Sequence, residues 1–120
     1  MSNFDLEAAV AKLPIKYFRG VFMKDQLPEK PNNIETAIIN LDENTGPGTH
    51  WTCYSISPRV IMYFDSYGLP PPVEFVKYAR RISSGPIWYT TLPTQTLIDP
   101  PICGREVLKV LSAISTSSLP

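Results

Sequence analysis

The fold is decided by the segment that runs from His50 to Asp65 and reads HWTCYSISPRVIMYFD. Both halves of this segment are rich in aromatic and β-preferring residues, and the Ser57-Pro58-Arg59 sequence between them is typical of a tight connection. Ser57 follows His50 by seven positions, and Asp65 follows Ser57 by eight. The segment therefore predicts a β-hairpin whose open end carries both His50 and Asp65.

Beyond the hairpin, two short apolar runs predict further strands, over residues 37–42 and 87–92. Segments dominated by proline, glycine and polar residues predict loops, over residues 26–33, 43–48 and 93–102. His50 is therefore expected directly after a glycine-flanked turn, at the start of its strand.

Three helices are predicted, over residues 5–12, 72–82 and 104–114. The second helix follows three consecutive prolines, which suit a helix N-terminus. Its expected packing stripe comprises Val73, Val76, Tyr78 or Ala79, and Ile82. The expected apolar face of the third helix comprises Val107, Leu108, Leu111 and Ile114.

The order of these elements predicts the fold class. Strands cluster in the middle of the chain, and helices stand before, between and after them, which favours an α+β fold. We expect a single domain over residues 1–120, with a small central β-sheet flanked by helices and a frayed tail over residues 115–120.

Composition excludes several classes of protein. A chain of 120 residues buries roughly two-thirds of its unfolded surface, so its core needs no metal or disulfide. One His and two Cys are too few for a zinc module or a disulfide scaffold. The 11 Lys and Arg balance 11 Asp and Glu, so the charge does not imply nucleic-acid binding. No cofactor and no metal are expected.

The hydropathy pattern indicates where in the cell the protein is expected. The N-terminal residues lack the basic and apolar regions of a leader peptide, and no apolar run approaches the ~20 residues that span a bilayer. We therefore expect a soluble intracellular protein without a membrane partner. In a reducing compartment both thiols stay free, so each is either a small buried hydrophobe or a reactive group.

The two cysteines differ in their sequence context. Cys53 lies inside an aromatic strand, which favours ordinary core packing. Cys103 falls at the N-terminus of the last predicted helix, where unpaired backbone N–H groups and the helix dipole favour a thiolate. Gly104 after it permits close approach of a substrate backbone. We therefore interpret Cys103 as a candidate nucleophile.

A thiol nucleophile needs a base, and His50 is the only histidine in the chain. Although a lone His in a turn is more often a surface residue, the context of Cys103 favours a catalytic role for His50. Asp65, expected at the same end of the hairpin, would orient the imidazole. Gln95, in the loop ahead of Cys103, offers an amide donor for an oxyanion, although a loop Gln alone carries little weight.

Four pieces of sequence, taken in chain order, resemble the adenovirus-protease-like (adenain-like) cysteine peptidases, a group whose fold is shared with the SUMO-specific proteases. These pieces are His50-Trp51, Phe64-Asp65-Ser66-Tyr67-Gly68, Gln95 and Cys103-Gly104. The branch found in adenoviruses, virophages and Polinton-type elements is the most similar, and the resemblance extends from about Phe18 to Leu111.

The resemblance implies roles for individual residues. Cys103 would be the nucleophile, His50 the general base, Asp65 its orienting acid and Gln95 the oxyanion donor. Trp51 would pack beside the imidazole and wall the substrate cleft with Gly104, although a strand Trp is equally often a core residue. No DNA or peptide activator is implied for this neutral chain, and its oligomeric state is not predicted.

The function implied is that of a viral thiol protease, a hydrolase that cleaves precursor proteins beside small residues during virion maturation, in the host cell or the virion. Two alternatives stay open. One is a catalytically inactive relative that serves as a binding or capsid-associated module, suggested by the short segment after Cys103 and the long interval from Gln95. The other is an enzyme that removes ubiquitin-like proteins from their conjugates.

Overall fold

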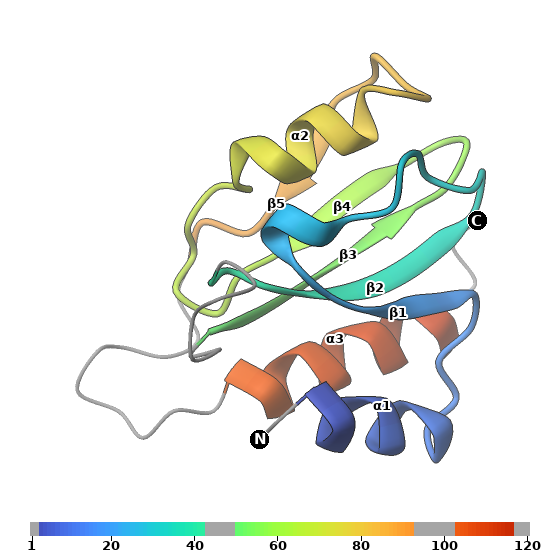
Figure 1. The fold of residues 1–120 in the computed structure, drawn as a ribbon, viewed down its shortest axis with the longest axis vertical. Coiled ribbons are helices and arrows are strands. Elements are labelled where there is room, and N and C mark those ends of the chain that lie inside the picture. Colours follow the sequence, from blue (N-terminus) through green and yellow to red (C-terminus); the bar gives the residue numbers. More distant parts are fainter. Residues whose placement is uncertain (1–2, 43–49, 93–102, 117–120) are drawn as a thin grey trace.

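The predicted hairpin is present and forms the centre of the molecule. β3 (Trp51–Ile56) and β4 (Ile61–Phe64) pair antiparallel, with Cys53 opposite Phe64. The computed structural model describes residues 3–42, 50–92 and 103–116. Within them, the sheet has the strand order β1-β2-β3-β4-β5 (Figure 1).

Two predicted strands flank the hairpin with shifted bounds. β2 (Glu35–Asn40) runs antiparallel to β3, and β5 (Ile87–Tyr89) runs parallel to β4. β2 begins two residues before its apolar run because Glu35 and Thr36 still pair with the end of β3. β5 ends at Tyr89, opposite Tyr63, rather than at residue 92. Pairing with the neighbouring strand, more than apolar composition, sets these ends.

β1 (Phe18–Met23) is a strand that the sequence analysis did not predict. It pairs in parallel with β2 at the edge of the sheet, and only Val21 is buried. The register shifts between Phe18 and Val21, where Gly20 has a φ of +156°. A Cβ on Gly20 would stand 3.0 Å from the Phe22 ring, so the irregular backbone favours glycine there. A strand with one buried residue has no alternating pattern to reveal it.

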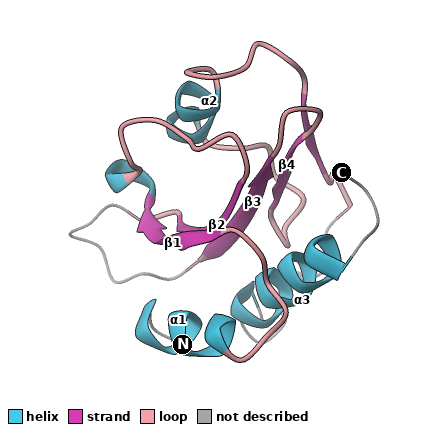
Figure 2. Cartoon of the chain, turned by 90° about the vertical axis from the view of Figure 1, so that its right-hand side faces the viewer, coloured by secondary structure: helices cyan, strands magenta, loops and turns pink. Residues whose placement is uncertain are grey.

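Helices cover both faces of the sheet. α1 (Asn3–Ala11) and α3 (Cys103–Thr116) lie on one face and α2 (Val73–Ala79) on the other (Figure 1 and Figure 2). A short 3-10 helix, η1 (Lys24–Gln26), follows β1. The predicted α+β class and helix-flanked sheet are therefore confirmed. No helix among the described residues is long and apolar enough to cross a membrane.

The predicted packing stripe of α2 is partly wrong. The helix packs through Phe75, Tyr78 and Ala79, which are buried, whereas Val73 is 61% exposed and Ile82 is 38% exposed. Val73 occupies the first helical position after extended backbone at the preceding proline, and the helix ends before residue 82. The stripe assumed a helix longer than the one that forms.

α3 packs as predicted but extends further. Val107 and Leu111 are buried, and Leu108 and Ile114 are half-buried. The helix continues to Thr116, past the predicted end at residue 114, and the Lys16 backbone N–H donates to Ser115 Oγ at 2.9 Å in the last turn. The expected fraying of residues 115–120 stays a prediction. Residues 117–120 lie outside the described residues.

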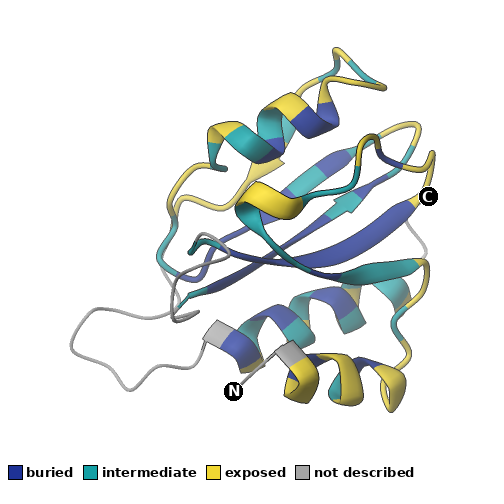
Figure 3. Cartoon of the chain, viewed as in Figure 1, coloured by how far each residue is buried: buried dark blue, intermediate teal, exposed yellow. Residues whose placement is uncertain are grey.

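The core consists of two apolar clusters, one on each face of the sheet (Figure 3). The cluster against α1 and α3 comprises Leu6, Val10, Val21, Ile38, Trp51, Cys53, Phe64, Val107 and Leu111. The cluster against α2 comprises Ala37, Ile39, Tyr54, Ile56, Ile61, Tyr63, Phe75, Tyr78 and Ala79. The alternation of β3 side chains between these clusters explains why its residues are almost all buried.

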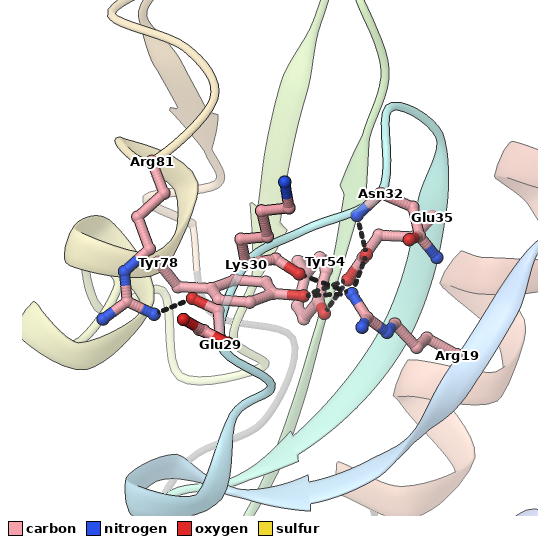
Figure 4. A network of polar contacts seen from close by, with 8 residues as sticks. All are labelled: Arg19, Glu29, Lys30, Asn32, Glu35, Tyr54, Tyr78 and Arg81. Carbon is pink, nitrogen blue, oxygen red and sulfur yellow. Dashed lines mark hydrogen bonds and ion pairs between the residues drawn. The ribbon is translucent and has the colours of Figure 1, made fainter.

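A buried carboxylate ties α2 to the sheet. Glu35 is fully buried, and its Oε2 accepts from the hydroxyls of Tyr54 at 2.5 Å and Tyr78 at 2.7 Å. Its Oε1 accepts from Arg19 Nη1 at 2.9 Å and from the Asn32 backbone N–H at 2.6 Å (Figure 4). We call Glu35, Arg19, Tyr54, Tyr78 and the Asn32 N–H the Glu35 cluster. It joins β1, β2, β3, α2 and the loop before β2.

Deprotonation of the buried tyrosines is expected to destabilise the fold at high pH. Burial, and then the hydrogen bond to Glu35, raises the pKa of Tyr78 to about 12, and the same two causes raise the pKa of Tyr54 further. The folded chain therefore binds more protons than the unfolded chain above the unfolded tyrosine pKa of about 10. The free energy of unfolding should be unaffected by tyrosine titration below that pH and should fall as pH rises from about 10 to about 12.

Urea unfolding at a series of pH values measures this effect. Tyr78→Phe should flatten the alkaline fall, because one of the titrating hydroxyls is removed. A wild-type unfolding midpoint that stays constant from about pH 9 to about pH 11.5 would contradict the expectation.

Candidate active site

His50 and Asp65 meet at the open end of the hairpin, as the sequence predicts. His50 directly precedes β3 and Asp65 directly follows β4. The His50 Nε2 atom lies 2.8 Å from Asp65 Oδ1, and the two side chains are 15% and 0% exposed. The turn at the other end of the hairpin is closed by the Ser57 N–H, which donates to Val60 O at 2.9 Å.

The contact with Asp65 defines the tautomer of His50. A carboxylate only accepts hydrogen bonds, so Nε2 carries the proton and donates it. In the neutral imidazole, Nδ1 then keeps its lone pair and is the nitrogen that can accept a proton from a thiol. The buried carboxylate stabilises the imidazolium that would result.

A turn after β4 shapes the surroundings of Asp65. The Gly68 N–H donates to Asp65 O at 2.8 Å, and Gly68 closes this turn with a φ of +74°. The Tyr67 backbone N–H donates to Asp65 Oδ1, also at 2.8 Å. One carboxylate oxygen thus accepts from both His50 and Tyr67. Among the described residues, the buried Oδ2 atom has no hydrogen-bond partner.

Tyr67 is a member of this site to which the sequence analysis gave no role. Its ring stacks on the His50 imidazole, with centroids 4.6 Å apart and planes inclined by 29°. Tyr67 lies in the turn from Asp65 to Gly68, beyond the last pair of the β3–β4 ladder, Cys53 with Phe64. The alternation of strand residues therefore gave no sequence signal for its contact with His50.

Cys103 begins α3, so its backbone stands at the N-terminus of a 14-residue helix, where the sequence places it. Its side chain lies outside the described part of the structure, as does the whole of Gln95. Gly104 is buried in the first turn of α3. The sheet end that carries His50 and Asp65 and the start of α3 lie on the same side of the molecule (Figure 1).

Trp51 and Cys53 belong to the core. Trp51 is 4% exposed and shares its cluster with Val107, one helical turn after Cys103. Its predicted role as a cleft wall stays a prediction. Cys53 is 1% exposed, and burial raises the pKa of its thiol, as expected of an unreactive core cysteine.

An apolar cleft of about 500 Å³ lies between the C-terminal half of α3 and the strands β3 to β5. Met62, Trp88, Val110 and Ile114 contribute to its lining, whereas His50 and Asp65 do not. Within residues 3–42, 50–92 and 103–116, no three His, Cys, Asp or Glu side chains are placed to share a metal ion.

Comparison with known proteins finds viral cysteine proteases and a SUMO protease. No family model matches the chain. A cysteine protease from a Malawi tick isolate of African swine fever virus is 29% identical over 65 residues, which cover 51% of this chain and 24% of that protein. A SUMO-1 cysteine protease from a South African tick isolate of the same virus is 27% identical over 75 residues, or 57% of this chain and 28% of that protein. The matched part spans about a quarter of these relatives.

Solved structures show the same fold. The crystal structure of the African swine fever virus protease superposes with a TM-score of 0.68 at 18% identity, over 95% of this chain and 57% of that one. The SUMO protease Ulp1 superposes with a TM-score of 0.50 at 19% identity, over 69% and 42% of the two chains. The chain therefore has the fold of the SUMO-protease-like cysteine proteases, an α+β domain with a mixed five-stranded sheet.

Proposed function

We propose that this chain is a cysteine peptidase in which Cys103 is the nucleophile, His50 the general base and Asp65 the acid that orients the base. The observation that carries this proposal is the 2.8 Å contact between His50 Nε2 and the buried Asp65 carboxylate. The position of Cys103 at the start of α3 and the viral relatives named as cysteine proteases support it.

The proposed reaction begins with a thiolate. The Cys103 thiol gives its proton to His50 Nδ1, and the thiolate attacks a peptide carbonyl carbon, so that a C–S bond forms and an electron pair moves onto the oxygen. Gln95 and the Cys103 backbone N–H would stabilise this oxyanion. The oxyanion collapses, the C–N bond breaks, and Nδ1 delivers its proton to the leaving amine.

Water completes the cycle. A water molecule gives a proton to His50 Nδ1 while the water oxygen attacks the thioester carbon. Collapse of this second intermediate breaks the C–S bond, releases the carboxylic acid and restores the thiolate and imidazolium pair. Asp65 Oδ1 accepts the Nε2–H throughout, so the imidazole keeps one orientation in both half-reactions.

The proposed substrates are viral precursor proteins cut beside small residues, often glycine, during virion maturation. This part of the proposal follows from the resemblance to the adenovirus-protease-like branch. The host cell or the virion would be the place of action, and Trp51 and Gly104 would border the substrate.

A second candidate substrate is a ubiquitin-like protein, because one viral relative is named a SUMO-1 cysteine protease and Ulp1 shares the fold. A ubiquitin-like vinyl sulfone probe separates the two substrates. Covalent labelling of Cys103 by this probe would favour deconjugation. If the chain cleaves glycine-containing peptides but the probe does not label it, precursor processing is favoured.

Alkylation tests the nucleophile. Iodoacetamide at neutral pH should modify Cys103 at least about tenfold faster than Cys53, because the helix N-terminus and His50 favour a thiolate at Cys103 whereas burial suppresses it at Cys53. Mass spectrometry of the two cysteine peptides over time gives both rates.

Matched single-cysteine variants control this measurement. Cys53→Ala should keep the fast reaction, and Cys103→Ala should leave only the slow one. Equally slow labelling of both thiols in the folded wild-type chain would overturn the proposal and favour the inactive binding module.

A further inference from the structure

Two buried polar atoms at the end of β4 have no hydrogen-bond partner among the described residues. They are the Tyr63 hydroxyl oxygen and Asp65 Oδ2, and the two residues are 2% and 1% exposed. Polar atoms in a protein interior are nearly always paired, either with protein groups or with ordered water. The other carboxylate oxygen, Oδ1, accepts from His50 and Tyr67. A donor is therefore expected at Oδ2 as well.

The two atoms belong to side chains that lie close together. Tyr63 is in β4 and Asp65 follows it by two positions, so both side chains leave the same face of the sheet. Thr52 on β3 and Asp65 each stand one residue beyond the last pair of the β3–β4 ladder. Thr52 is fully buried, and its hydroxyl donates to Ile39 O at 3.2 Å, which leaves the Thr52 oxygen able to accept.

The electrostatics of the Tyr63 hydroxyl support this proximity. Burial raises the pKa of Tyr63, the nearby Thr52 hydroxyl lowers it in part, and the negative charge of Asp65 raises it again. The hydroxyl thus lies near both groups without a direct hydrogen bond to either. A buried water needs two to four polar partners, and Tyr63 Oη, Asp65 Oδ2 and Thr52 Oγ1 provide three.

We propose that Tyr63 is a positioning residue of Asp65 and holds its carboxylate through one buried water. The Tyr63 O–H donates to the water, which donates one O–H to Asp65 Oδ2 and the other to Thr52 Oγ1. With donors on both oxygens, the carboxylate keeps Oδ1 directed at the His50 Nε2–H. The inference rests on the proposed function and deepens it, since it assigns the orientation of the acid to a further side chain.

A crystal structure of the chain tests the water directly. At a resolution that shows ordered waters, the wild type should contain one within about 3 Å of both Tyr63 Oη and Asp65 Oδ2. Well-ordered Tyr63 and Asp65 side chains with no water between them would overturn the proposal.

The single histidine gives a readout that does not depend on catalysis. In a chain labelled with ¹⁵N at histidine, the imidazole signals belong to His50 alone. Tyr63→Phe removes only the hydroxyl, so the water is held less firmly and Asp65 Oδ2 loses part of its donor. The carboxylate charge then acts more strongly on the imidazolium, and the pKa of His50 should rise by about 0.5 or more. A folded Tyr63→Phe chain in which His50 titrates as in the wild type, or at lower pH, would overturn the inference.

Tyr78→Phe is the matched control for this titration. Tyr78 is also a buried tyrosine on the α2 side of the sheet, but its hydroxyl donates to Glu35. Its replacement should lower the free energy of unfolding and leave the pKa of His50 unchanged, which separates general destabilisation from positioning of the acid. Backbone amide spectra establish that each variant is folded.

Peptide cleavage provides a second readout. Tyr63→Phe should lower kcat by about 3- to 10-fold with little change in KM, because a loosely held acid affects the chemical step more than substrate binding. Tyr78→Phe should cleave within about twofold of the wild type at a temperature where it is folded. If no variant cleaves peptide while the shift at His50 persists, the positioning role stands and the proposed function fails.

Discussion

Replacing His50 with glutamine is expected to reduce kcat/KM for a glycine-containing peptide by about 10³- to 10⁴-fold, because general acid–base catalysis contributes on that order or slightly less and activation of the thiol is lost as well. The chain contains no other histidine that could take over. Glutamine retains an N–H that can reach the Asp65 carboxylate, so the buried acid keeps a donor. Steady-state hydrolysis of a fluorogenic peptide measures the effect.

A double variant of His50 and Cys103 tests whether the two residues act together in catalysis. Residues that act as one unit are not additive, so His50→Gln combined with Cys103→Ala should be no slower than Cys103→Ala alone. Cys53→Ala is the matched control and should cleave at nearly the wild-type rate. Peptide cleavage that survives His50→Gln within about tenfold of the wild type would refute the role of His50 as general base.

Replacing Glu35 with alanine is expected to lower the free energy of unfolding by about 3–5 kcal/mol, the usual cost of removing one partner from a buried ionic cluster. The change leaves the Tyr54 and Tyr78 hydroxyls and the Asn32 N–H without their acceptor in the interior. The Arg19 side chain is 28% exposed, so water compensates part of its loss. A domain of this size has a total free energy of unfolding of roughly 5–15 kcal/mol, so the expected loss is a large share of the total.

Urea unfolding followed by circular dichroism measures the loss, and two variants control it. Glu29→Ala removes an exposed carboxylate from the loop before β2 and should change the free energy of unfolding by less than about 0.5 kcal/mol. Glu35→Gln nearly preserves the side-chain volume, so it separates loss of the carboxylate from formation of a cavity. If Glu35→Gln and Glu29→Ala are equally harmless, the Glu35 cluster does not stabilise the fold through its charge.

Two errors in the sequence-based prediction have different physical causes. β1 was not predicted because it has a single buried residue and an irregularity at a glycine, so its apolar and polar residues do not alternate. The strand forms through its pairing with β2. The stripe of α2 assigned Val73 and Ile82 to the core because the apolar pattern is longer than the helix, which begins at Val73 and ends at Ala79. Pairing with a distant segment decides β1, whereas the length of the helix decides which α2 positions pack.

The sequence by itself determined the hairpin, its short turn and the meeting of His50 with Asp65. These features depend on neighbours within 15 positions, where strand propensity and turn chemistry act directly. It also determined the start of a helix at Cys103, through the loop before it and the apolar face behind it.

Only the tertiary structure decided the stacking of Tyr67 on His50 and the Glu35 cluster. The first depends on the turn from Asp65 to Gly68, which follows β4 and brings the Tyr67 ring against the imidazole. The second joins Glu35 to Tyr78, 43 positions away, and to Arg19, 16 positions away. Such contacts form only when the packing of the sheet against α2 brings distant polar groups together in the interior, where each must find a partner.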